Sequence, residues 1–76
     1  MVRLQTGVGA KQGVRPGEIV GTIAHFADIP GSALGAIRIE EQKTYVDVPN
    51  EFVQKVLGAN GNYKLRNKSI TLEKSG

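Results

Sequence analysis

Polar and apolar residues alternate along four stretches of the chain, and the clearest of these is 43–48. There Val46 and Val48 face one side, and Tyr45 and Asp47 face the other. Alternation with period two in a β-branched run predicts a strand with one buried face and one open face. The same alternation predicts three further strands, at 2–6, 36–40 and 69–73.

Two other stretches repeat their apolar residues every three or four positions. One runs from Ile19 to Ala27 and follows Pro16 and Glu18, which both favour the start of a helix. The other lies in 50–58, where an apolar stripe is followed by Gly58 and Gly61. The sequence therefore predicts two amphipathic helices, one after the first strand and one after the third.

The predicted order is strand, helix, strand, strand, helix, strand, which indicates an α+β, ferredoxin-like split βαβ fold. Right-handed crossovers place both helices on one face of the four-stranded antiparallel sheet. The strands at 2–6 and 43–48 are then central, and Tyr45 lies on the open face near Arg3 and Lys43, with Arg38 on one flank. A length of 76 residues suits one domain, so 1–76 is expected to form a single RRM-like unit.

The charge is mildly basic, with ten Lys and Arg against seven Asp and Glu, for a net charge of +3. The basic excess is concentrated near the two ends of the chain. Charge alone fits an ordinary basic surface as well as a surface for nucleic acid. Cysteine is absent, which excludes disulfides and fits a reducing cytoplasm. No apolar run approaches the ~18 residues of a membrane span, so a cytoplasmic protein without a membrane partner is expected.

The sequence contains few candidate residues for catalysis, metal binding or nucleotide binding. His25 has no second ligand, and the neighbouring Glu40 and Glu41 would point to opposite faces of a strand. The glycines between 7 and 13 are spaced one residue too widely for a dinucleotide fingerprint, and no phosphate loop follows them. We therefore expect no catalytic residue, no metal and no cofactor, and interpret 7–13 as a flexible basic turn.

RNA recognition modules of this topology stack bases on aromatic residues of the third strand. Tyr45 occupies such a stacking position. Lys43 stands where a second aromatic residue would lie, and Arg3 replaces the aromatic residue of the first strand. The sequence therefore predicts either weak binding of single strands or binding through charge and RNA shape.

Several blocks then carry a family resemblance. Residues 13–24, Gly-Val-Arg-Pro-Gly-Glu-Ile-Val-Gly-Thr-Ile-Ala, resemble the opening of the auxiliary C-terminal RNA-binding domain of bacterial DEAD-box RNA helicases, the DbpA and CsdA kind. Residues 29–31, 34–37, 45–49 and 65–68 are similar to later blocks of that family, in the same order and at matching spacings. The resemblance covers nearly the whole chain.

The resemblance implies a non-enzymatic, monomeric module, excised from a larger ATP-dependent RNA helicase. It would tether the helicase core to structured RNA, either ribosomal RNA in ribosome biogenesis or broader targets in cold adaptation or RNA turnover. The 76 residues contain no ATPase motif. The alternative, favoured by mixed charges on the open face, is a protein-interaction or dimerisation module with the same fold. The implied RNA-contacting residues are Arg3, Lys11, Arg15, Arg38, Lys43, Tyr45, Lys64, Arg66 and Lys68.

Overall fold

In the computed structural model, which describes residues 1–75, the strand that carries Tyr45 lies in the middle of a four-stranded sheet. This strand, β3 (Thr44–Val48), pairs with β2 (Ile37–Ile39) on one side and β1 (Val2–Thr6) on the other. The fourth strand, β6 (Glu73–Lys74), pairs with the far edge of β1. All pairings are antiparallel, and the order β2-β3-β1-β6 confirms the predicted topology.

The pleat of the two central strands separates a buried face from an exposed one. On the buried face, Leu4, Thr44, Val46 and Val48 are at most 1% exposed. Thr44 is polar, and its hydroxyl donates a hydrogen bond of 2.7 Å to the carbonyl of Val8, which satisfies this buried donor. The alternation that predicted these strands therefore corresponds to their packing.

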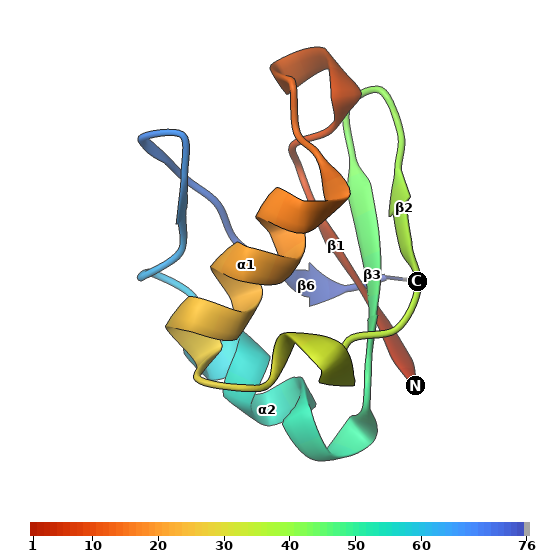
Figure 1. The fold of residues 1–76 in the computed structure, drawn as a ribbon, viewed down its shortest axis with the longest axis vertical. Helices are drawn as coiled ribbons and strands as arrows, with labels where there is room; N and C mark the ends of the chain where they lie inside the picture. Colours follow the sequence, from red (N-terminus) through yellow and green to blue (C-terminus); the bar gives the residue numbers. More distant parts are fainter. Residues whose placement is uncertain (76) are drawn as a thin grey trace.

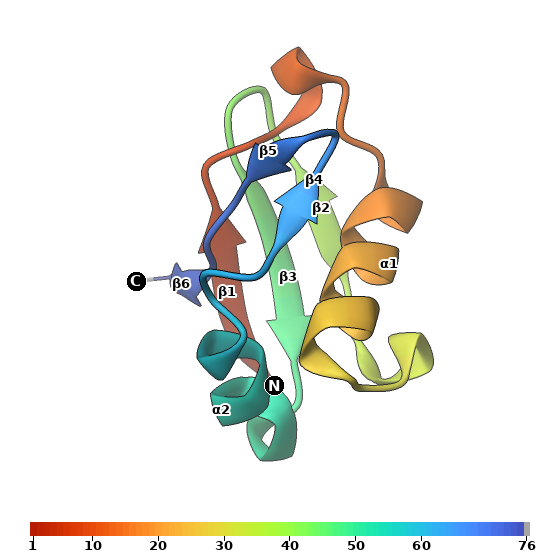
Figure 2. The ribbon, with the colours of Figure 1, turned by 90° about the vertical axis from the view of Figure 1, so that its left-hand side faces the viewer.

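Two helices cover this buried face. α1 (Pro16–Ala27) packs through Ile19, Ile23 and Ala27, and α2 (Asn50–Gly58) packs through Val53 and Val56. Figure 1 shows both helices on the same side of the strands, and Figure 2, viewed from that side, shows them in front of the sheet. The predicted α+β architecture, with both helices on one face, is confirmed.

Tyr63, which follows α2, belongs to the hydrophobic core and is 1% exposed. Its hydroxyl donates a hydrogen bond of 2.6 Å to the carbonyl of Val56 in α2. Burial raises the pKa of Tyr63 to about 12, because the phenolate would lose its hydration. The phenol therefore remains protonated and keeps this bond at neutral pH.

The end of the chain differs from the prediction. Residues 63–68 are not a simple basic connection, because β4 (Lys64–Leu65) and β5 (Lys68–Ser69) form a short hairpin. The predicted last strand, 69–73, is also wrong in its bounds, since sheet pairing begins only at Glu73. The side chain of Asn60 accepts from the N–H of Leu72 and donates to its carbonyl, at 2.9 and 2.8 Å. These bonds occupy the backbone N–H and carbonyl of Leu72, which a strand at this position would have used for pairing. Ile70 and Leu72 are nevertheless buried, as predicted.

The opposite face of the sheet carries no covering element. α1, α2 and the β4–β5 hairpin all lie on the side seen in Figure 2, and no helix or hairpin of residues 1–75 lies on the other side. None of the helices described for this chain has the length and hydropathy needed to cross a membrane. The bare face is therefore a regular surface that the fold leaves available to a partner.

Candidate nucleic-acid interface

A row of four side chains crosses the bare face of the sheet. The strand register places Tyr45 of β3 opposite Arg38 of β2 and Gln5 of β1, and it places Gln5 opposite Glu73 of β6. Neighbours across antiparallel strands lie close enough for their side chains to touch. The half-buried ring of Tyr45 is therefore centred in the sheet, with a guanidinium on one side and an amide on the other.

Carboxylates neutralise part of this surface. Nε of Arg3 lies 3.1 Å from Oδ1 of Asp47, and Nε of Arg38 lies 3.1 Å from Oε2 of Glu40. The amide of Gln5 donates to Glu73 at 3.0 Å. The bare face is therefore a mixed surface in which each arginine retains donors beside a carboxylate partner.

A hollow of about 310 Å³ lies beside the ring of Tyr45. It is lined by Arg3, Arg38, Glu40, Tyr45 and Ser75. The backbone N–H of Ser75 donates to the carbonyl of Arg3 at 2.9 Å, which continues the pairing of β6 to this point. An aromatic ring that shares a hollow with two guanidinium groups can stack a nucleobase while the guanidinium groups contact a phosphate at the same place.

At one end of the sheet, the turn η1 (Ala10–Gln12) packs on the β2–β3 hairpin. The backbone N–H groups of Ala10 and Lys11 donate to the carbonyls of Glu40 and Glu41, both at 2.8 Å. Gly9 is buried at this junction. These bonds place Lys11 near the β2–β3 connection that contains Lys43, so two cations that lie far apart in sequence share one end of the domain.

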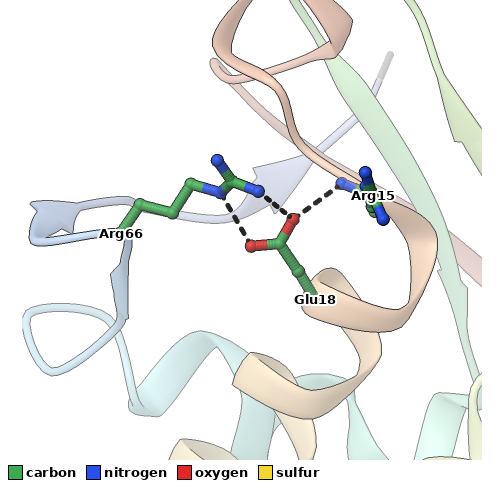
Figure 3. Close-up of polar contacts among 3 residues, drawn as sticks. All are labelled: Arg15, Glu18 and Arg66. Carbon is green, nitrogen blue, oxygen red and sulfur yellow. Dashed lines mark hydrogen bonds and ion pairs between the residues drawn. The ribbon is translucent and has the colours of Figure 1, made fainter.

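The β4–β5 hairpin is attached to the start of α1 by an ion pair (Figure 3). Nε and Nη2 of Arg66 donate to the two carboxylate oxygens of Glu18, at 2.8 and 3.0 Å. One of these oxygens also accepts the backbone N–H of Arg15 at 3.2 Å. The hydrogen bonds from Arg66 hold the pKa of Glu18 below its ordinary value of 4.5, so the pair stays ionised at neutral pH and is lost only in more acidic solution.

A second hollow, of about 240 Å³, lies between η1 and this hairpin. Its floor is apolar and its rim carries hydrogen-bond donors. The lining residues are Val8, Val14 and Leu65 on the floor, and Gln12, Arg66 and Lys68 on the rim.

The nine residues that the sequence predicted as RNA contacts thus fall into two groups. Arg3, Arg38, Lys43 and Tyr45 lie on or beside the bare face. Lys11, Arg15, Lys64, Arg66 and Lys68 lie in η1, at the start of α1 and in the β4–β5 hairpin. The hairpin lies on the covered side of the sheet, which separates its residues from the bare face, whereas Lys11 lies at the end of the domain that also holds Lys43.

The sequence did not reveal two of the carboxylates that pair with the predicted arginines, one on the bare face and one at the start of α1. Glu40 pairs with Arg38, and Glu18 pairs with Arg66. Glu18 had a visible signal only as a residue that favours the start of a helix, since its partner lies 48 positions away. Among residues 1–75, no group of three or more His, Cys, Asp or Glu side chains is arranged to hold a metal ion.

A four-stranded antiparallel sheet backed by two helices, with an aromatic ring on its bare face, is the architecture of RRM-like modules. A model of the family described as "DbpA RNA binding domain" matches residues 3–74. The chain therefore belongs to the DbpA RNA binding domain family, and it is an RNA-binding module. Comparison with curated proteins finds none that matches it significantly.

Proposed function

We propose that this domain binds structured RNA through its bare sheet face and through a basic loop end, which consists of η1, the β2–β3 connection and the β4–β5 hairpin. In this way it would tether a DEAD-box helicase core to that RNA. The observation that carries the proposal is the ring of Tyr45, which is half-buried in the centre of the uncovered face, lies beside Arg38 and shares a hollow with Arg3. Ribosomal RNA is the expected target class, and the cytoplasm of a bacterium is the expected setting. The domain supplies binding and no chemistry.

Tethering is an effect of effective concentration. A domain that holds RNA beside a linked core makes the engagement of the core intramolecular, at an effective concentration of the order of millimolar for a short linker. In a chain that carries both parts, deletion of this domain should raise the RNA concentration needed for half-maximal ATPase activity and leave the maximal rate unchanged. An unchanged RNA requirement would exclude the tethering role.

The RNA contact is tested by titration of the domain with a structured hairpin and with a single strand, at several salt concentrations. About four phosphate contacts predict a slope of about −3 to −4 in a plot of log affinity against log salt. Structured RNA should bind more tightly, since only one aromatic platform is available for stacking an unpaired strand. An affinity that does not change with salt, or no binding at low salt, would contradict this account.

A second candidate function is supported by the ion pairs on the bare face. Arg3 with Asp47 and Arg38 with Glu40 give this surface both signs of charge, as many protein interfaces have. The domain would then dock a protein or a second copy of itself across Tyr45. Light scattering distinguishes the two: a stable dimer that RNA cannot dissociate would favour the second function, and a monomer favours the first.

A further inference from the structure

We propose that Glu18 is a positioning residue for RNA binding, which acts by holding the guanidinium of Arg66 with its free edge directed toward RNA. The proposal rests on the function proposed above and adds a role for a carboxylate. A carboxylate near RNA phosphates would ordinarily weaken binding, because like charges repel. The geometry around Arg66 indicates that the carboxylate of Glu18 instead strengthens RNA binding.

The ion pair uses only part of the guanidinium. Nε and Nη2 of Arg66 face Glu18, and this two-point contact fixes the plane of the group. Nη1 makes no hydrogen bond within residues 1–75, and it lies above Gly13, 3.4 Å from where a Cβ would stand. Arg66 lines the second hollow together with Gln12 and Lys68, so its remaining donors join two other donor side chains on one rim. Such a rim suits the acceptor atoms of RNA.

The turn between β4 and β5 has an unusual backbone conformation. Arg66 and Asn67 have φ of 52° and 64°, in the left-handed region that glycine and asparagine adopt most readily. An arginine at such a position is strained, and glycine would form the turn at lower cost. Because glycine would suit this backbone better, the arginine at this position indicates a role for its side chain.

Glu18 is held firmly enough to orient its partner. It lies in the first turn of α1, and the oxygen that receives Nη2 of Arg66 also accepts the backbone N–H of Arg15 (Figure 3). Its side chain is 29% exposed, whereas that of Arg66 is 54% exposed. The carboxylate is thus the fixed member of the pair, and the guanidinium is the member available to a ligand.

The test is Glu18→Gln, which keeps an oxygen for the N–H of Arg15 and removes the charge that holds Arg66. If charge alone mattered, the variant would bind the RNA hairpin more tightly, since one negative charge is gone. Positioning predicts the reverse, a loss of about threefold to tenfold in affinity, as expected for a coupled pair. Glu51→Gln is the matched control, because Glu51 lies in the first turn of α2 and forms no ion pair among the described residues.

A double-mutant cycle separates positioning from a structural effect. In a protein that already carries Arg66→Gln, Glu18→Gln should no longer weaken binding, and circular dichroism should show all variants folded. Equal or tighter binding by the single Glu18→Gln variant would overturn the inference, as would the same loss in the Arg66→Gln background. If the unmodified domain itself fails to bind the hairpin, the proposed function fails rather than the role of Glu18.

Discussion

Replacement of Gly9 by alanine is expected to lower the free energy of unfolding by about 2–4 kcal/mol. A Cβ on Gly9 would collide with the carbonyl of Glu40, and it would lie only 2.7 Å from the backbone nitrogen of Lys43 and 2.9 Å from the carbonyl of Glu41. These are backbone atoms and cannot rotate away. Relief requires η1 to separate from the β2–β3 hairpin, which breaks the two hydrogen bonds at 2.8 Å that join them.

A loss of this size is a large share of the total free energy of unfolding of the domain. Domains are typically stable by roughly 0.05–0.15 kcal/mol per residue, or about 4–11 kcal/mol for a chain of this length. Urea denaturation measures the change as a lower midpoint with an unchanged slope. Gly7→Ala is the control, because no atom lies within 4 Å of its Cβ position and no large loss is expected. A Gly9→Ala midpoint equal to that of the control would show that the junction is not closely packed.

Replacement of Tyr45 by alanine is expected to weaken RNA binding by about 1–3 kcal/mol, or about 5- to 150-fold. The ring is the aromatic platform of the bare face, and the register places Arg38 and Gln5 directly beside it. A base stacked there would lose its contact surface with the ring. The fold should survive, since the core residues of β3 lie on the opposite face.

Tyr45→Phe separates the ring from the hydroxyl. It keeps the stacking surface, so its affinity for the hairpin should stay close to that of the unmodified domain. Isothermal calorimetry with the same RNA measures both variants. Equal affinities for Tyr45→Ala and the unmodified domain would remove Tyr45 from the interface and leave the loop end as the RNA surface.

Most of the fold could be predicted because its pattern is local. The alternation around Tyr45 and the helical stripe that begins at Ile19 each follow from burial on one face, and Pro16 marks the start of α1. The segment after α2 has such a pattern only at 69–73, where the alternation identified the buried residues Ile70 and Leu72 but not the start of strand pairing at Glu73. Its course depends on the side chain of Asn60, which occupies the backbone of Leu72, and on the left-handed turn at Arg66. Neither the hydrogen bonds of Asn60 nor this turn follows from the polar and apolar pattern of the neighbouring sequence.

The candidate site also has features that follow from local pattern and features that depend on contacts between distant parts of the chain. The position of Tyr45 on the bare face, with Arg38 beside it, followed from the strand order. The pairing of Arg3 with Asp47 required the register of β1 on β3, which depends on how the two faces pack rather than on either strand alone. The role of Glu18 required the hairpin to return to α1 from a distant part of the chain.

The most direct test of the central claim is a map of backbone amide chemical shifts during addition of an RNA hairpin. The account predicts the largest changes at Gln5, Arg38 and Tyr45 on the sheet and at Arg66 in the hairpin turn, with little change along the exposed side of α2 at Gln54 and Lys55. Changes concentrated on α2, with Tyr45 and its neighbours unaffected, would contradict it.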